Sequence, residues 1–500
     1  MKVLKYMAAG LLALGLSACS SDYLDIEDRE YLDSDAAREA AGHNPDAFLN
    51  GMWSHLVDMY NSSHDAFNFM SVLHACDWAG EDMVFANPQT NYFIWDYQLD
   101  NRMNNYRRVY VNWSTFYTAI SKANEVIGLY PGLTADNDDG KALLGQALAS
   151  RGFSYDYLIQ LFRPYLGADG KIKYDSKGLP IYLTEADGFT LEELQELQGV
   201  NTVKAVLDQA QSDLEKAVAL LEESGFERAN KDYIDANVAN GLLARHYLLT
   251  QQWEKAGEAA AKARNGYKPM NETQLHDGLV SITANPEIMW GFIHSTETST
   301  IYASFFSHIS NLAPGYTGAG YKTVCIDARL YSQIPDDDYR KSLYNGPAGD
   351  TSQPTASARY PYANLKFGDD GNWTMDYTYM RAAEMYLIQA EALVRQGKGG
   401  DAAKVLGELM ANRQTRWNKA SVTLEDVLLQ RRIELWGEGF VFFDLKRNNK
   451  GMQRTYEGSN HLQTDLTWID VPAQDDRWTY QISLTELQEN SRITEDDQNP

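Results

Sequence analysis

Residues 383–412 read AEMYLIQAEALVRQGKGGDAAKVLGELMAN, and this stretch decides the fold class. Apolar residues recur at helical spacing on both sides of a glycine-rich break. Ala390 in the first half faces Ala402 and Leu406 in the second, so small side chains lie where the two halves would meet. Small residues at such positions allow two helices to pack closely. The stretch therefore predicts a helical hairpin.

Residues 237–268 carry the same pattern. When Ala244 is superimposed on Ala390, Ala256 falls on Ala402, twelve residues later in both segments. A repeated helix pair is typical of tetratricopeptide repeats, whose period is about 34 residues. An unrelated α-helical bundle is the alternative. Further helices are predicted at 113–129, 141–162 and 203–222.

The fold class that follows is mainly α, with short strands. We expect a tetratricopeptide-like helical repeat scaffold at about 113–269 and 376–450, within a single body at 46–500. The segments 76–112 and 270–375 lack long periodic runs. The first is rich in aromatic residues, and the second is rich in Gly, Pro, Asn and Tyr. We interpret them as irregular, loop-rich insertions, which repeat scaffolds often carry on their binding face.

The N-terminus has the features of an export leader. The sequence LSAC at 16–19 closes a segment with a positive start and a short apolar run. A cysteine at the first mature position indicates a bacterial lipoprotein, because its thiol can carry a covalent lipid such as palmitate. An ordinary signal peptide followed by a chance cysteine is the alternative. We expect a signal peptide at 1–18, a lipid anchor on Cys19 and an acidic tether at 19–45.

The charge balance is strongly acidic. The chain has 44 Lys and Arg against 69 Asp and Glu, which gives a net charge of −25. Nucleic-acid binding needs clustered basic residues, so we expect no nucleic-acid partner. After the leader, no apolar run approaches the ~20 residues of a membrane helix.

Two features leave alternatives open. Cys76 and Cys325 could pair or remain as free thiols, because two cysteines do not make a disulfide framework. The sequence PDDD at 335–338 could bind calcium or form a turn, and it lacks the spacing of a dedicated calcium loop. We expect no cofactor beyond the lipid on Cys19.

Three ordered motifs occupy the C-terminal third. They are R..E.YL..AEA at 381–392, RR.EL..EG at 431–439 and DL.R at 444–447. In order and spacing they resemble the SusD/RagB family of Bacteroidetes outer-membrane lipoproteins, and the likeness covers nearly the whole chain. Gln430 departs from the family pattern, in which an acidic residue is usual at this position.

The resemblance implies a function and a location. Members of this family bind glycans at the cell surface, without catalysis. They pass oligosaccharides to a SusC-like TonB-dependent β-barrel transporter in the outer membrane. The implied partners of this chain are therefore an oligosaccharide, that transporter and the outer-membrane lipid reached through the anchor.

Aromatic residues are the expected glycan contacts. The chain has 31 Tyr, 17 Phe and 11 Trp, many of them in polar stretches. Sugars stack their CH faces on such rings and need polar partners for their hydroxyl groups. For each ring, packing beneath a loop is the alternative. The candidates are Asp77, Trp78, Asp82, Tyr92, Trp95 and Asn101 in the first insertion, and Trp290, Tyr302, Tyr316 and Tyr321 in the second.

The C-terminal motifs also place opposite charges close together. Glu434 and Glu438 are one helical turn apart, beside Arg431 and Arg432. They could form a catalytic pair, but arginines would keep both carboxylates ionised, whereas glycoside hydrolysis needs one acid with a raised pKa. We therefore interpret these residues as a partly buried salt-bridge network.

Three functions are compatible with the sequence. The first is a non-catalytic glycan-binding lipoprotein. The second is a surface glycoside hydrolase on a helical scaffold, and the third is a helical-repeat scaffold protein of the cell envelope. The aromatic insertions favour the first, because a pure scaffold would need apolar grooves instead.

Overall fold

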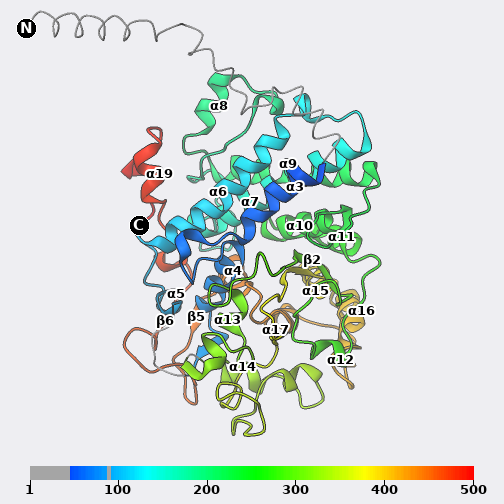
Figure 1. The fold of residues 1–500 in the computed structure, drawn as a ribbon, viewed down its shortest axis with the longest axis vertical. Coiled ribbons are helices and arrows are strands. Elements are labelled where there is room, and N and C mark those ends of the chain that lie inside the picture. Colours follow the sequence, from blue (N-terminus) through cyan, green and yellow to red (C-terminus); the bar gives the residue numbers. More distant parts are fainter. Residues whose placement is uncertain (1–44, 87–91, 322) are drawn as a thin grey trace, which may run out of the picture.

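The computed structural model describes residues 45–86, 92–321 and 323–500. Long helices dominate one half of the molecule and form a stack in which each helix packs on the next (Figure 1). We call this part the helical stack. It consists of α6 (Arg107–Ile127), α7 (Asp138–Phe162), α9 (Val203–Ser224), α10 (Ala236–Leu249), α11 (Trp253–Ala263), α15 (Ala382–Arg395) and α16 (Gly399–Met410).

The helical stack confirms the mainly α, tetratricopeptide-like fold class. The helices predicted at 141–162 and 203–222 correspond to α7 and α9 within a few residues. Helix α6 begins six residues before its predicted start at 113. Its first turn contains Arg108, which is buried and paired with Asp96 at 3.2 Å. A pattern of apolar residues cannot detect a turn that is buried through an ion pair.

Small residues account for the close contact within the repeated helix pairs. Ala244 and Ala256 lie on α10 and α11, and Ala390 and Ala402 lie on α15 and α16. All four side chains are fully buried. The two helices of each pair pack on each other, and α11 also packs on α15. The two hairpins predicted from the sequence are therefore neighbours in one stack.

Glycines allow the closest approach in the stack, between α7 and α9. A Cβ atom on Gly145 would lie 2.8 Å from Leu221 Cγ, and one on Gly152 would lie 2.8 Å from Leu214 Cγ. Such distances are shorter than a normal van der Waals contact. Glycine costs helix stability in the middle of a helix, and here it is offset by the packing that it permits.

The other half of the molecule contains short helices, short strands and long connections (Figure 1). Its helices include α4 (Phe69–Trp78), α5 (Ile94–Gln98), α12 (Glu272–Leu275), α13 (Phe305–Ile309), α14 (Ala328–Ser332), α17 (Leu424–Glu434) and α18 (Val441–Arg447). Its strands are β1 (Met83–Phe85), β2 (Ile288–Phe292), β3 (Val324–Ile326), β4 (Tyr377–Arg381), β5 (Met452–Gln453) and β6 (Asp470–Val471). Three further helices are labelled in Figure 1: α3 (Pro45–Ser54), α8 (Leu191–Leu197) and α19 (Leu484–Glu489).

The strands join segments that are distant in sequence. Strand β1 pairs with β3 in antiparallel fashion, with Val84 opposite Cys325, and β2 pairs with β4, with Ile288 opposite Arg381. These pairs connect the two aromatic segments to each other and to the start of α15. The expected loop-rich insertion at 76–112 contains more regular structure than the sequence indicated, namely the end of α4, β1, α5 and the first turn of α6.

The charged motifs form a salt-bridge network, as predicted, and it is buried. Its pairs differ from those expected, because Arg431 pairs with Asp444 and Arg432 with Asp82, and other arginines bind Glu434. The Glu434 carboxylate accepts hydrogen bonds from Arg413 at 2.8 Å, Arg381 at 3.0 Å and Arg340 at 3.0 Å. Burial alone would raise the pKa of Glu434, but Arg413, Arg381 and Arg340 hold it well below its usual value. Glu438 pairs with Arg381 at 2.7 Å, and its pKa is also lowered.

A second buried group of charges connects α15 to α17 and α18. Glu391 accepts from Arg447 at 2.6 Å, and Asp444 accepts from Arg431 at 3.0 Å. Despite burial, Arg447 lowers the pKa of Glu391, and Arg431 and Arg447 lower that of Asp444. The signature motifs therefore join the helical stack to the loop-rich half through ionised pairs.

The structure decides between the alternatives that the sequence leaves open for the two cysteines and for the segment 335–338. Cys76 and Cys325 are both buried, free thiols. The segment 335–338 ends in Asp338, whose carboxylate caps the following turn and pairs with Arg340 at 2.6 Å. Within the described ranges, no group of three or more side chains is arranged to hold a metal ion. The lipid anchor at Cys19 lies outside the described residues, and no helix inside them could cross a membrane.

Candidate functional site

Three predicted tyrosines and one histidine gather at the surface. His64 is central, with its ring centroid 5.8 Å from that of Tyr92, 6.4 Å from Tyr302 and 5.9 Å from Tyr316. The Tyr316 ring is 5.0 Å from Tyr92 and 5.2 Å from Tyr302. We call these four residues the tyrosine–histidine cluster. Tyr92 is 40% exposed and Tyr302 is 49% exposed, so both side chains are accessible at the surface.

Hydrogen bonds fix the hydroxyl group at the centre of this cluster. The Tyr316 hydroxyl lies 2.6 Å from His64 Nδ1 and donates to the Tyr92 hydroxyl at 3.2 Å. Burial and the hydrogen bond to Tyr92 raise the pKa of Tyr316, so this phenol stays neutral under ordinary conditions. The cluster therefore offers ring faces together with neutral donors and acceptors, which is the chemistry that sugar hydroxyl groups require.

The cluster is anchored to the interior through stacked rings. His308, which is fully buried on α13, stacks on Tyr316 with centroids 5.0 Å apart and on Phe67 with centroids 5.8 Å apart. The His308 Nε2 atom donates to the main-chain oxygen of His64 at 2.8 Å. His308 thus holds both a ring of the cluster and the loop that carries His64. This arrangement supports a rigid, preformed surface.

The loop that presents His64 has an unusual backbone. Asn61, Ser62 and Asn68 have φ values of 45°, 55° and 52°, in the left-handed region that non-glycine residues rarely adopt. Each such residue costs about 1–3 kcal/mol and persists only where the surroundings hold it. The Asp65 carboxylate binds Arg107 at 2.7 Å and holds this loop against α6. Backbone strain of this kind is concentrated at functional sites.

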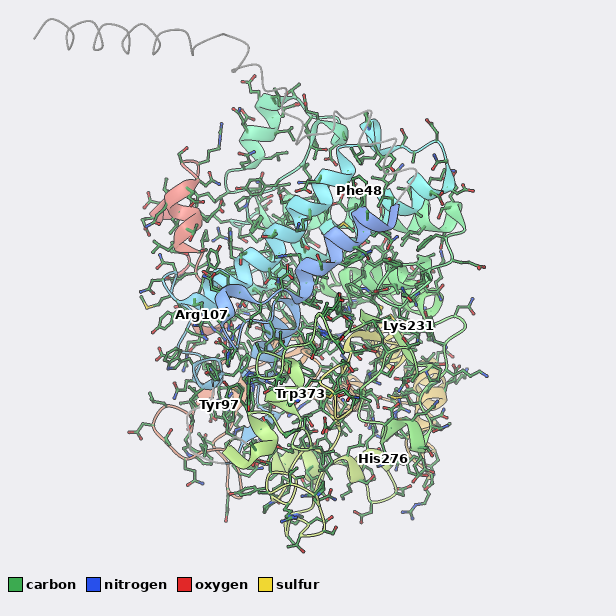
Figure 2. All side chains as sticks on the ribbon, viewed as in Figure 1. Phe48, Tyr97, Arg107, Lys231, His276 and Trp373 are labelled. Atoms are coloured by element: carbon green, nitrogen blue, oxygen red, sulfur yellow. The ribbon has the colours of Figure 1, made fainter. Side chains whose placement is uncertain are left out.

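Close approach of the main chain positions Tyr316 from the other side. A Cβ atom on Gly315 would lie 2.5 Å from Ser307 Oγ and 2.8 Å from the Trp373 ring, which Figure 2 labels near the centre of the molecule. The Tyr316 amide donates to Ser307 Oγ at 3.0 Å. Glycine at 315 therefore lets this turn pack against α13 and bring Tyr316 to the cluster.

Two of the predicted tryptophans lie in the interior. The Trp78 ring stacks on Phe85 with centroids 3.7 Å apart, and its Nε1 donates to His74 at 2.9 Å. Trp290, on β2, packs against Trp53 and donates to a main-chain oxygen. Both rings are almost completely inaccessible to solvent, so the prediction that they form part of an exposed platform is wrong. The alternative of packing beneath a loop applies to both.

The predicted polar contacts are structural as well. Asp77 accepts from the Gly439 amide at 2.7 Å, Asp82 pairs with Arg432, and Asn101 donates to Asp96 at 2.8 Å. All of them are buried, so the expectation that they face a ligand is corrected by the structure. Burial raises the pKa of Asp77 well above its usual range.

Trp95 is exposed but lies outside the tyrosine–histidine cluster. Its side chain is 54% exposed, and its ring is 6.4 Å from that of Tyr106. The Tyr321 side chain lies outside the described residues, so its predicted role stays a prediction. Of the ten predicted contacts, Tyr92, Tyr302 and Tyr316 are the ones that the structure brings together.

Sequence reasoning missed His64 and His308. The sequence selects neither of them, because their neighbours show no metal-binding or catalytic spacing. The one available signal was the polar run Asn61-Ser62-Ser63 before His64, which is typical of a loop. His64 lies close to Tyr302 and Tyr316 because of tertiary contacts, which a local sequence pattern does not predict.

Two other places in the fold are weaker candidates for a functional site than the tyrosine–histidine cluster. Glu434 and Glu438 are fully buried and both have lowered pKa values, so neither provides the general acid that glycoside hydrolysis needs. A cavity of about 60 Å³ lies among helices α7, α10, α15 and α18, with Phe153, Tyr157 and Phe443 in its wall. It has room for about two water molecules and shares no residue with the cluster.

Two family models match this sequence. The model described as "SusD family" matches residues 335–500, and the model described as "Starch-binding associating with outer membrane" matches residues 22–253. The SusD-like protein P38 of Formosa agariphila is 23% identical over 411 residues, which cover 72% of this chain and 76% of that protein.

Solved structures have the same fold. A SusD-like carbohydrate binding protein from Bacteroides vulgatus ATCC 8482 is 26% identical with a TM-score of 0.76, and the match covers 92% of this chain and 98% of that chain. Surface glycan-binding protein A from Bacteroides thetaiotaomicron, solved in complex with laminarihexaose, is 13% identical with a TM-score of 0.66. That match covers 91% of this chain and 99% of that chain, and it shows that the two chains share a fold.

Proposed function

This chain belongs to the SusD/RagB family, and on that premise we propose that it is a cell-surface lipoprotein that binds glycan chains and delivers them for import. The tyrosine–histidine cluster is the proposed binding site. The observation that carries this proposal is the convergence of three half-exposed tyrosines around His64, held by hydrogen bonds and by stacking on buried His308. The B. vulgatus relative is a carbohydrate binding protein, which supports the same ligand class.

The proposal includes an anchor and a partner. Cys19 carries a lipid that holds the protein on the outer membrane, and residues 20–45 act as a tether. The partner is a SusC-like TonB-dependent β-barrel that receives the glycan. The lipoprotein motif at 16–19, the match to a model described as associating with the outer membrane and the acidic composition support this arrangement.

We propose that binding involves no catalysis and no cofactor. Glu434 and Glu438 accept hydrogen bonds from arginines and are buried, which disfavours glycoside hydrolysis by this pair of carboxylates. An envelope scaffold without a ligand would not require the strained loop at 61–68 or the exposed rings of Tyr92 and Tyr302. Both features favour a binding site over a scaffold surface.

The test is affinity electrophoresis of the full-length protein in mild detergent. Gels containing laminarin, starch, xylan or pectin are compared with a gel that contains no polysaccharide. We expect at least one polymer to slow migration, and we expect no release of reducing sugar on incubation. Sugar release would show a hydrolase, and unchanged migration in all four gels would show that this proposal is wrong.

Variants locate the binding site. Tyr302→Ala and Tyr316→Ala remove ring faces of the cluster and should lower affinity about tenfold each, because aromatic residues dominate such contacts. Tyr174→Ala is the matched control, since Tyr174 is 41% exposed and its main-chain oxygen accepts from Lys204 at the start of α9, in the helical stack. Equal affinity for all three variants would exclude the cluster as the site.

A further inference from the structure

We propose that Trp95, Tyr106, Tyr110 and Tyr60 form a second carbohydrate-contacting surface, which continues the tyrosine–histidine cluster. We call these four residues the α6 row. The ligand would then be an extended glycan chain that contacts both surfaces, rather than a short sugar held at one of them. This inference rests on the proposed function and extends it to the length of chain that the protein recognises.

The rings of the α6 row follow one another along one side of α6. The Trp95 ring lies 6.4 Å from that of Tyr106 at an interplanar angle of 68°. Tyr106 immediately precedes α6, and Tyr110 follows one turn later, with its amide donating to the Tyr106 oxygen at 3.3 Å. The Tyr60 ring lies 5.0 Å from that of Tyr110. Tyr106 and Tyr110 are four residues apart, so the Trp95–Tyr106 pair and the Tyr60–Tyr110 pair both lie at the start of α6.

The burial of these rings suits a contact surface. Trp95 is exposed, and Tyr60, Tyr106 and Tyr110 are half-buried. Burial, together with the neighbouring Tyr60 and Glu489, raises the pKa of Tyr110, so its hydroxyl group remains a neutral donor and acceptor. A half-buried ring loses little conformational freedom when a ligand binds to its open side.

Ion pairs hold the loop that carries Tyr60 against the helix that carries Tyr110. Arg107 Nη2 donates to the two oxygens of Asp65 at 2.7 Å and 2.8 Å, and Arg108 donates to the Asp65 main-chain oxygen at 3.0 Å. Burial alone would raise the pKa of Asp65, but Arg108 and Arg107 lower it, so the carboxylate stays ionised. Figure 2 shows Arg107 at the start of α6, on the side of the molecule where α5 lies.

The two surfaces are connected twice along the chain. Tyr92 of the cluster is three residues from Trp95 of the row, and Tyr60 of the row is four residues from His64 of the cluster. Fully extended chains of these lengths span at most about 11 Å and about 14 Å. The main chains of the row and the cluster are therefore close together at both connections.

Polar groups beside the row match the needs of sugar hydroxyl groups. Asn61, Ser62 and Asn105 are exposed next to Tyr60 and Tyr106 in the chain. The Arg107 side chain is 47% exposed, so its outer edge is open to a ligand hydroxyl group. Rings interspersed with neutral amides and hydroxyls suit a glycan better than they suit the apolar face of another protein.

The experiment compares ligands of different length on the full-length protein in mild detergent. The probes are whichever polymer slows migration in the electrophoresis described above, its hexasaccharide and its disaccharide, and affinities are measured by calorimetry. We expect the hexasaccharide to bind at least tenfold more tightly than the disaccharide. Trp95→Ala should weaken hexasaccharide binding about tenfold and leave disaccharide binding unchanged.

Controls separate this inference from the proposed function. Trp95 is largely exposed, so its replacement should leave the melting temperature unchanged, and Tyr106→Ala serves as a second variant of the row. Tyr302→Ala should weaken binding of both ligands, and Tyr174→Ala of neither. If the wild type binds glycan but Trp95→Ala and Tyr106→Ala bind the hexasaccharide with the same affinity as the wild type, the α6 row is excluded as a contact surface. The proposal for the tyrosine–histidine cluster would then still stand. If the wild type binds no polymer, both proposals fall.

Discussion

The helical stack and the aromatic segments differ in how their sequences relate to their structure. In the stack, the residues predicted to meet, such as Ala244 and Ala390, are the ones that are buried. In the segments 77–102 and 290–321, aromatic residues in similar sequence surroundings differ in burial, since Trp78 is fully buried and Tyr302 is half exposed. The difference teaches that helical periodicity reports on burial, whereas aromatic content alone does not.

The largest expected effect concerns the charges that join the two halves. Glu434→Gln should lower the free energy of unfolding by about 3–5 kcal/mol at pH 7, because buried arginines lose their charged partner. The pKa values of Glu434, Glu438, Glu391 and Asp444 are all lowered in the folded protein. Their contribution is therefore complete above the unfolded values of about 4 and is lost as the pH falls below them.

The measurement is urea unfolding of wild type and variant across a range of pH from neutral to acidic. The wild type should lose stability steeply below about pH 4, and Glu434→Gln should show a shallower loss. Glu223→Gln is the control, since Glu223 forms an exposed pair with Lys141 and should change little. Parallel pH curves for wild type and Glu434→Gln would show that this network does not control acid stability.

The next effect distinguishes the buried aromatic residues from the exposed ones. Trp78→Ala should lower the free energy of unfolding by about 3–5 kcal/mol, because it leaves a cavity against Phe85. Tyr302→Ala should change it by no more than about 0.5 kcal/mol, because that ring lies at the surface. Thermal unfolding of both variants is the measurement, and similar losses for the two would contradict the assignment of Trp78 to the core.

The smallest effect concerns the contact between α7 and α9. Gly152→Val should lower the free energy of unfolding by about 1–3 kcal/mol, because its Cβ atom would lie 2.8 Å from Leu214 Cγ and 3.1 Å from the Ala210 main-chain oxygen. Gly51→Val is the matched control, since no atom lies within 4 Å of its Cβ position on α3. Urea unfolding of the two variants should separate them. Equal stability would mean that the helices adjust without cost.

Much of the fold was predictable because its signals are local. The hairpins at 237–268 and 383–412 are confirmed. A salt-bridge network of the C-terminal motifs is confirmed as well, although its partners come from distant segments. The early start of α6 and the short helix α5 were missed, because buried ion pairs and mixed aromatic composition hide helical periodicity. Three of the candidate contacts meet in one cluster, while His64, at its centre, had no signal strong enough to select it.

The sequence by itself determined the helical repeats. They depend on neighbours within a turn or two of helix, and such neighbours are known from spacing alone. The arginines that keep Glu434 ionised come from distant parts of the sequence, so the tertiary structure supplied them. Only the tertiary structure decided which aromatic residues face solvent. His64, Tyr92, Tyr302 and Tyr316 meet because strand pairing, the His308 stack and the Asp65–Arg107 pair bring distant segments together. The burial of a ring in an aperiodic segment is a property of those distant contacts, and the same rings in another arrangement would form a core instead of a binding surface.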